Sequence, residues 1–373
     1  MTSLSYKQVV SLIKSVGHKR TVIVRGENGV GKTSIQNALR QDPDFAGFNV
    51  MHPIDCTQLS DGSVWMPDID RDNGVSHELP NARFGVSRTN RRGWAGSRPS
   101  IICLDEVLKC PQYIKNMLAP IQYERRVGDY ELPEGSIVWC ATNLSVEGLG
   151  DTIQPHLRTR VIMADMRKST QQEWKNDFAI PAGLNPYLIA FTDLYPDLFD
   201  SFLDYEEGGK YAGKALSKDN PRIFNPRVAQ DGYFSPRTAH AASDVLDAAE
   251  GMDAETLKAA LAGTIGESAA GMLMAVVNLQ SDVPSFERVA ADPEAAPLPS
   301  NPNAQLVQVN MFLTRSRTRE EASAVVTYVQ RMRTEMQTLF TNTVANSTRV
   351  ALFGTVLAFQ QMLKDNKLFL NLK

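Results

Sequence analysis

A glycine-rich segment near the amino terminus has the residue types and spacing of a phosphate-binding loop (P-loop). Residues 26–33 read Gly-Glu-Asn-Gly-Val-Gly-Lys-Thr and fit the pattern G-x-x-x-x-G-K-[ST] at every fixed position. Glycines allow backbone N–H groups to close around phosphate oxygens, while the lysine and the threonine hydroxyl suit the β- and γ-phosphates and Mg²⁺. The predicted nucleotide-binding residues are Gly26, Glu27, Asn28, Gly29, Val30, Gly31, Lys32, Thr33 and Ser34.

Two acidic residues follow an apolar run further along the chain. Residues 101–106 read Ile-Ile-Cys-Leu-Asp-Glu, which is typical of a buried parallel strand whose carboxyl end meets a ligand. Asp105 is predicted to bind Mg²⁺ together with Thr33, and Glu106 to orient and activate the attacking water. An Asp-Glu pair after an apolar run is common by chance, and the P-loop upstream favours the functional interpretation.

A polar residue ends another apolar run. Asn143 follows residues 136–142, which predict a further buried strand. A polar residue at the carboxyl end of a strand in such a sheet faces the same crevice, so Asn143 is predicted to hold the attacking water or the γ-phosphate. An asparagine that only starts a turn is the alternative.

Three arginines are candidates for contact with phosphate. Arg158 and Arg160 precede a predicted strand at 161–162, far along the sheet from their own P-loop, which suits the site of a neighbouring subunit. Favourable charge at a helix C-terminus is the alternative for both. Arg237 lies in the first turn of a helix that Ser235 is predicted to cap. A positive charge opposes the helix dipole there unless it meets an anion, so Arg237 is a candidate γ-phosphate sensor.

The elements that must position these residues follow an alternating pattern. Helix patterns and strand patterns alternate through the first 168 residues, and this order predicts a parallel sheet flanked by helices. Residues 57–99 interrupt the alternation with many turn formers, and they predict an insert with a hairpin around 65–67 and 83–85. The predicted helices are 5–16 and 34–39, and the strands are 21–24, 48–51, 101–106 and 136–142.

The rest of the chain has helical patterns. Thr170 and Glu173 form a capping-box signature just after residue 168. Prolines between 284 and 302 predict a linker-like stretch, and amphipathic helices are expected near 319–340 and 344–363.

Composition limits the functional classes. The chain has 373 residues, 43% of them hydrophobic, which is enough for substantial cores, and a formal charge of −3, which argues against a surface built to coat nucleic acid. The arginines at 88, 91, 92 and 98 form either a solvated loop or an edge that contacts a neighbouring subunit or a polyanion. No apolar run reaches the length of a membrane span and no secretion signal is apparent, so we expect a cytoplasmic protein without membrane contact.

The cysteines are expected to be structural. They lack metal-ligand spacing, and two of them lie inside predicted buried strands. We predict reduced core thiols at Cys56, Cys103, Cys110 and Cys140.

Taken together, these motifs resemble the MoxR-like branch of the AAA+ ATPases. The resemblance covers roughly residues 5–280 and rests on GENGVGKT, LDEV, the helix and hairpin from KCPQYIKNM to ELPEGS, VWCATN, LRTRV and FSPRT. It implies an α/β AAA+ P-loop NTPase core at 1–168 with the insert at about 57–99. It further implies an α-helical lid at 169–282 and a mainly helical C-terminal extension at 283–373.

The same resemblance implies roles for individual residues. Lys32 and Thr33 fall in the Walker A motif, and Asp105 and Glu106 in Walker B. Sensor 1 falls on Asn143 and sensor 2 on Arg237. The arginine finger that reaches an adjacent subunit falls on Arg160, with Arg158 as the alternative.

The resemblance also implies an assembly and partners. Family members form rings, usually hexamers, in which a heterologous interface completes each site. They commonly act as chaperone-like remodellers alongside a protein with a von Willebrand factor A domain. No aromatic pore-loop motif stands out in this sequence. In this respect the sequence differs from AAA+ proteins that thread a polypeptide through the ring.

We therefore predict an ATP- and Mg²⁺-dependent ATPase that remodels or activates a protein partner. The alternative is a nucleic-acid-associated AAA+ motor or an McrB-like GTPase subunit, supported only by the arginines at 88–98. A nucleotide-dependent scaffold, in which assembly matters more than turnover, is a third possibility.

Overall fold

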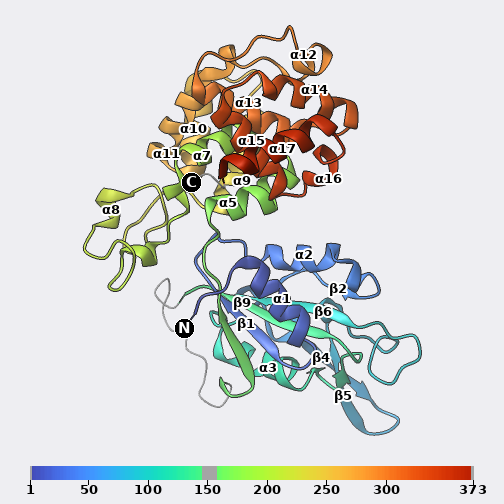
Figure 1. The fold of residues 1–373 in the computed structure, drawn as a ribbon. Helices are drawn as coiled ribbons and strands as arrows, with labels where there is room; N and C mark the ends of the chain where they lie inside the picture. The colour runs from blue at the N-terminus through green and yellow to red at the C-terminus, as the bar shows by residue number, and fades with distance from the viewer. Residues whose placement is uncertain (1, 145–157, 371–373) are drawn as a thin grey trace. The chain divides into compact units, whose positions relative to one another are not determined.

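The computed structural model describes residues 2–144 and 158–370. The chain forms two compact units, Met1–Lys168 and Ser169–Lys373 (Figure 1). The first unit combines helices and strands, and the described part of the second is helical. No helix in the described ranges is both long and apolar enough to cross a membrane.

A six-stranded sheet forms the centre of the first unit. Its order is β10-β1-β9-β6-β2, and β3 pairs with β6 beyond the end of β2. Every ladder is parallel, which requires crossover connections and places helices over both faces. The strands are β1 (Thr21–Arg25), β2 (Asn49–Val50), β3 (Ile54–Asp55), β6 (Ser100–Asp105), β9 (Ile137–Thr142) and β10 (Val161–Asp165).

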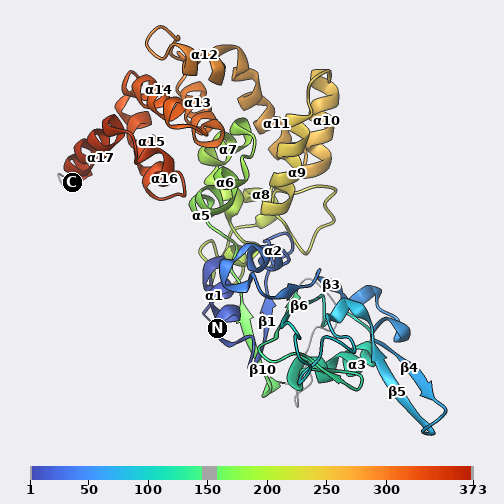
Figure 2. The same cartoon turned by 90° about the vertical axis from the view of Figure 1, so that its right-hand side faces the viewer.

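Helices bury both faces of this sheet (Figure 2). Because successive side chains of a strand point to opposite faces, Val22 and Val24 of β1 join one apolar cluster and Ile23 joins another. The first cluster includes residues of α1 (Tyr6–Val16) and α2 (Ser34–Gln41), and the second includes residues of α3 (Gln112–Tyr123). The parallel sheet flanked by helices that the sequence predicts is confirmed.

The edge of the sheet differs from the prediction. A strand was expected at 48–51, but β2 has only two residues, and the chain leaves the sheet at 51–53 before β3 pairs with β6. Pro53 has no N–H for a ladder, which favours this interruption. The interruption moves the end of β3 to the carboxyl end of β6, where Asp55 is the register partner of Asp105.

The insert contains an antiparallel hairpin, β4 (Trp65–Asp70) with β5 (Val75–Pro80). The expected strand start at 65–67 is correct, but the second strand is not at 83–85, where a 3-10 turn (Ala82–Phe84) ends at Gly85 with φ 67°. The sequence signal that was missed is an Asx turn after β4. Its Asp70 Oδ1 accepts from the N–H groups of Asp72 and Asn73, both at 3.1 Å.

This hairpin lies against a second one, β7 (Arg126–Val127) with β8 (Tyr130–Glu131). The backbone N–H of Glu78 donates to Asp129 Oδ2 at 2.9 Å, and the N–H of Asp129 donates to the Glu78 carbonyl at 3.1 Å. Gly128, with φ 55°, lies so close to Glu78 that a side chain there would clash with its backbone. The insert is therefore fastened to the hairpin that follows α3.

A buried arginine ties the opposite end of the sheet together. The Arg125 guanidinium donates to Thr21 Oγ1 at 2.7 Å and to the carbonyls of Gly17 at 2.8 Å and Gln122 at 2.6 Å. Burial lowers the pKa of Arg125 to about 10. One side chain thus joins the ends of α1 and α3 to the start of β1.

The second unit is a bundle of helices around one apolar core. The buried cluster runs from Trp174 to Met362, so the segments 169–282 and 283–373 share it. The helices are α5 (Gln171–Trp174), α6 (Ile180–Ala182), α7 (Pro186–Leu194), α8 (Leu216–Asp219), α9 (Pro236–Asp247), α10 (Ala254–Ile265), α11 (Glu267–Val277), α12 (Phe286–Ala291), α13 (Pro302–Arg315), α14 (Arg319–Gln330), α15 (Thr334–Ala345), α16 (Val350–Phe353) and α17 (Leu357–Leu370).

Two expectations for this unit are wrong. The proline-rich stretch is not a linker, since it contains α12, whose Phe286 and Val289 are buried, and its Pro297 carbonyl accepts from Tyr328 Oη at 2.6 Å. The two helices expected at 319–340 and 344–363 are four, α14 to α17, because the chain turns after α14, after α15 and after α16. The first error has a physical cause, because burial against distant segments overrides the local signal for a linker.

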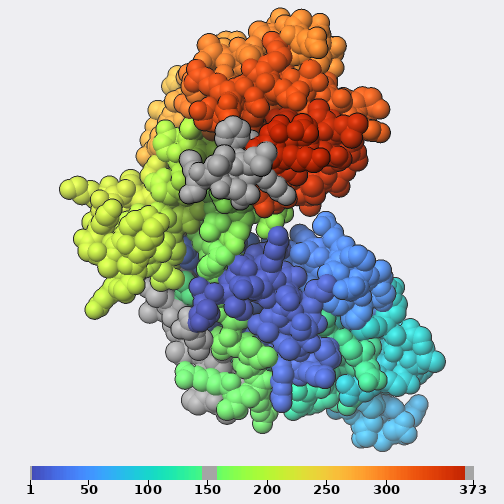
Figure 3. Space-filling model, viewed as in Figure 1, coloured from blue at the N-terminus to red at the C-terminus, as the bar shows by residue number. Residues whose placement is uncertain are grey.

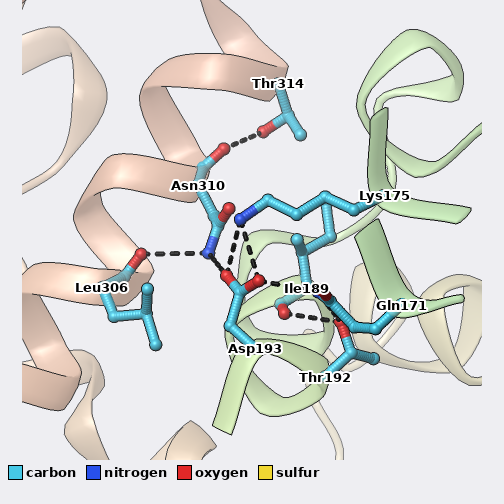
Figure 4. A network of polar contacts seen from close by, with 8 residues as sticks. All are labelled: Gln171, Lys175, Ile189, Thr192, Asp193, Leu306, Asn310 and Thr314. Carbon is cyan, nitrogen blue, oxygen red and sulfur yellow. Dashed lines mark hydrogen bonds and ion pairs between the residues drawn. The ribbon is translucent and has the colours of Figure 1, made fainter. Parts of the chain in front are cut away.

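A buried polar network links α13 to the first helices of the unit (Figure 4). Asp193 of α7 accepts from Lys175 Nζ at 2.7 Å, from Gln171 Nε2 at 2.7 Å and from Asn310 Nδ2 at 2.8 Å. The side chains of Lys175 and Asp193 are only 4% and 11% exposed, so little solvent screens this ion pair. Lys175 opens a π-helical turn, Lys175–Ala179, between α5 and α6.

Candidate active site

The P-loop connects β1 to α2 in the conformation that its glycines permit. Gly29 and Gly31 have φ values of 76° and 96°, a region that residues with a Cβ rarely adopt. Ser34 Oγ donates to the Gly31 carbonyl at 2.7 Å and fixes the loop to the first turn of α2. The loop therefore ends at a helix N-terminus, the geometry that favours a bound phosphate.

Lys32 lies at the centre of the site and is only 6% exposed. Its ammonium donates to the carbonyls of Gly26 at 2.8 Å and Glu27 at 2.7 Å, and to Asn143 Oδ1 at 2.7 Å. Asn143 directly follows β9, so the structure brings this predicted residue to the P-loop, as the parallel strand order requires. Lys32 thus has polar partners that phosphate oxygens are able to replace.

The acidic pair lies at the end of β6, beside the P-loop. Thr33 Oγ1 donates to Asp105 Oδ2 at 3.0 Å, which brings together the two residues predicted to bind the metal. A hydroxyl and a carboxylate are hard oxygen ligands that suit Mg²⁺, which usually binds one or two carboxylates together with phosphates and water. Within the described ranges, no group of three or more His, Cys, Asp or Glu residues is placed to hold a metal.

Glu106 has an unusual backbone conformation. Its φ of 52° lies in the left-handed region, one of only two such non-glycine residues among those described, the other being Arg125. Such strain concentrates at functional positions, where it directs a side chain away from the regular course of a strand. The Glu106 carboxylate forms an ion pair with Lys109 at 3.1 Å, and this lysine was not predicted as part of the site.

A second missed residue is Asp55, at the end of β3. It pairs in register with Asp105, so it adds a carboxylate at the same edge of the sheet. Its Oδ1 accepts from the N–H of Thr57 at 2.9 Å and from the Thr57 hydroxyl at 2.6 Å, which caps the turn that follows. Sequence reasoning could not find it, because a strand of two residues leaves no periodic signal.

The candidate arginine-finger residues lie at the amino ends of the strands, opposite the carboxyl ends where the P-loop and the acidic pair lie. The register Thr21↔Val161 places Arg160, one residue before β10, at the amino end of β1, whereas the P-loop follows the carboxyl end. At a rise of roughly 3.3 Å per residue, the length of β1 separates them by more than about 13 Å. Arg160 is exposed, and its guanidinium carbon lies 4.7 Å from the ring centre of Tyr123. Arg158 is also exposed, and Leu157 of the LRTRV motif lies outside the described residues.

Arg237 lies in the second unit, in the first turn of α9. Ser235 caps this helix through a capping box with Thr238, and Pro236 occupies the first turn, as predicted. The Arg237 side chain is exposed. Its contact with a phosphate stays a prediction.

The arginines of the insert are mostly engaged within the protein. Arg88 forms an ion pair with Asp68 at 3.0 Å and Arg92 with Glu131 at 3.0 Å, while Arg98 Nε donates to the Gly47 carbonyl at 3.0 Å. Of the four arginines at 88, 91, 92 and 98, Arg91 alone has a side chain without an acceptor among the described residues. This arrangement does not form the open cationic surface that a nucleic-acid backbone requires.

The four cysteines are buried free thiols. Burial raises the pKa of all four thiols, of which Cys103 and Cys140 lie inside strands β6 and β9. Neutral thiols in these positions pack as small apolar groups, as predicted.

No protein-family model matches the chain, and no curated protein matches it. Solved structures of similar shape include NtrX from Brucella abortus in complex with ADP, at 12% identity and a TM-score of 0.37, covering 96% of this chain and 69% of that one. A point mutant of Thermotoga maritima RuvB has 14% identity and a TM-score of 0.32, covering 76% and 73%. A putative ATPase from Cytophaga hutchinsonii has 12% identity and a TM-score of 0.29, covering 96% and 79%.

Similarities this distant do not define a function, so the topology and the site carry the argument. The P-loop strand β1 lies between β10 and β9, and the acidic strand β6 lies beyond β9. This order, with the P-loop after β1 and further helices after the sheet, is that of an AAA+ P-loop core with a helical C-terminal part, the fold class that the sequence predicts.

Proposed function

We propose that this protein is a Mg²⁺-dependent ATPase of the MoxR-like AAA+ class. The observation that carries the proposal is the convergence of Lys32, Thr33, Asp105 and Asn143 at one edge of the sheet, through contacts of 2.7 Å and 3.0 Å. A phosphate-binding loop, a metal-binding pair and a polar sensor are the parts that phosphoryl transfer to water requires.

Each residue of the site has a role in this reaction. The P-loop N–H groups bind the phosphates, and Lys32 exchanges its loop carbonyls for β- and γ-phosphate oxygens. Thr33 and Asp105 would hold Mg²⁺, which when bound neutralises charge on the phosphates. Glu106 orients the attacking water and accepts its proton, and Asn143 positions the γ-phosphate or the water.

The position of Arg160 supports a ring in which sites are shared between subunits. An arginine at the amino edge of the sheet is too far from its own P-loop to contact the γ-phosphate there. In a closed ring, most simply a hexamer, the same arginine reaches the site of the next subunit, with Arg158 as the alternative. Arg237 would contact the γ-phosphate from the helical lid. We further propose that the ring, in the cytoplasm, remodels a protein partner, such as one with a von Willebrand factor A domain.

The Glu106→Gln variant tests the proposal. We expect it to bind a fluorescent ATP analogue as the wild type does and to release phosphate at less than about one hundredth of the wild-type rate, because the proton acceptor is lost. Glu134→Gln is the matched control, since Glu134 is exposed and outside the site. Normal ATP turnover by the Glu106→Gln variant would refute the proposal. Parallel assays of the wild type with GTP show which nucleotide is preferred.

A further inference from the structure

The insert and hairpin β7–β8 form a pocket of about 330 Å³ on the first unit. Residues 91–94 line one side and residues 129–131 line the other. None of them belongs to the candidate active site. The pocket therefore offers a binding surface separate from the one proposed for the nucleotide.

Arg91 is the distinctive residue of this pocket. Its guanidinium carbon lies 5.3 Å from the ring centre of Trp94 and 5.4 Å from that of Tyr130. Contact with two aromatic rings fixes the guanidinium while leaving its N–H groups available. No residue in the described part of the chain accepts a hydrogen bond from this side chain or pairs with its charge. Arg91 is thus a positioned cation without an anion.

The other charges of the pocket indicate which anion fits. Arg92 is paired with Glu131 at 3.0 Å, and Asp129 Oδ2 accepts from the backbone of Glu78 at 2.9 Å. The two carboxylates on the wall repel every anion, and the repulsion is strongest for a polyphosphate or a nucleic-acid backbone, which carries several negative charges. A single carboxylate matches the fork of the guanidinium and leaves the existing pairs intact.

Apolar side chains are exposed next to the pocket. Arg88 forms an ion pair with Asp68 of β4 at 3.0 Å, so the loop at residues 88–98 and hairpin β4–β5 form one surface. The hairpin stands out from the rest of the unit (Figures 2 and 3). Large apolar side chains on this surface are exposed to an unusual degree, namely Met66 at 60%, Val75 at 47% and Trp94 at 46%, and Met66 and Val75 lie on the same face of the hairpin as Asp68.

We propose that this surface binds a protein segment in which an aspartate or glutamate is flanked by apolar residues. The carboxylate pairs with the N–H edge of Arg91, and the apolar neighbours cover Trp94 and the exposed side chains of the hairpin. This inference rests on the proposed action on a protein partner, and it names the surface and the chemistry of that partner.

A selection with full-length protein tests the inference. A random nine-residue peptide library on phage is panned against the wild type, and synthetic peptides of the consensus are then measured by fluorescence anisotropy. We expect a consensus with an acidic residue between apolar ones. Replacing the acid by its amide, or making Arg91→Ala or Arg91→Lys, should weaken binding about tenfold or more, because a charge-assisted hydrogen bond is lost. Arg71→Ala, an exposed arginine at the tip of the same hairpin, should bind normally.

A consensus without an acid, or equal binding by the Arg91 variants, would overturn the inference. So would binding of a twelve-nucleotide oligothymidine that depends on Arg91, because the surface would then serve nucleic acid. Circular dichroism and ATP turnover of the Arg91 variants show whether the fold and the nucleotide site are intact. Peptide binding needs no ATP hydrolysis. The binding result can therefore be interpreted even if the proposed ATPase activity is not found.

Discussion

The indole Nε1 of Trp139 donates to the side-chain oxygen of Gln36 at 2.7 Å, in the buried interior of the first unit. The amide nitrogen of the same glutamine donates to the carbonyls of Ile101 at 2.9 Å and Met51 at 2.8 Å. One side chain of the helix that follows the P-loop therefore contacts β9, β6 and Met51, which directly follows β2. It fixes Lys32 and Thr33 relative to the strands that present Asn143 and Asp105.

Trp139→Phe should destabilise the first unit. The substitution leaves Gln36 Oε1 buried without a donor, which costs about 1–3 kcal/mol, in addition to the packing lost with the indole. Urea unfolding followed by circular dichroism measures the change. Trp94→Phe is the control, since Trp94 is 46% exposed and its replacement should change stability little. Equal effects of the two substitutions would show that the hydrogen bond of Gln36 contributes nothing.

Arg160→Ala should abolish hydrolysis while ATP binding is retained, because we propose that this arginine acts on the site of the next subunit. Mixing Arg160→Ala subunits with Lys32→Ala subunits should restore part of the activity, since some interfaces then combine an intact P-loop with an intact finger. Arg20→Ala, an exposed arginine at the same edge of the sheet, is the control. If mixed rings form but stay inactive, the shared site is wrong. If only Arg158→Ala is inactive, Arg158 is the finger.

Lys175→Met should destabilise the second unit by about 3 kcal/mol, because it leaves the Asp193 carboxylate buried without its cation. Adding Asp193→Leu to this variant should recover much of the loss, since apolar residues of similar volume often replace a buried pair well. Thermal unfolding of the single and double variants measures both effects. Lys210→Met removes a lysine whose side chain is 63% exposed and should be nearly neutral. A double variant less stable than Lys175→Met would contradict this account.

Asp282 should make stability depend on pH in acid. Hydrogen bonds from the backbone of Asn301 and Ser300 lower its pKa below the usual 3.8. A lowered carboxyl pKa gives stability that is full above the pKa of the unfolded chain and is lost as pH falls through the folded one. The Tm difference between wild type and Asp282→Asn should thus be constant above about pH 5 and shrink below about pH 4. A difference that does not change with pH would contradict the lowered pKa, and Asp231→Asn is the exposed control.

The residues that sequence reasoning found share a strong local signal. The P-loop and the apolar run before Asp105 are each defined within ten residues, and both lie where the pattern indicates. Asp55 and Lys109 have no such signal. The register between β3 and β6 brings Asp55 to the site, and the ion pair with Glu106 across a strained turn brings Lys109 there. The same limit explains the mistaken linker: Phe286 and Val289 are buried by helices far away in the sequence.

The strand order also has a consequence for synthesis on the ribosome. Strand β1 is made before every other described strand of the sheet, yet its partners β9 and β10 are the last of them. Its apolar residues therefore have no complete ladder until residue 165 has left the exit tunnel, and the closure of so long a loop makes folding slow. We expect nascent chains that end before β10 to depend on chaperones and to be degraded readily, whereas those that include it fold as a unit.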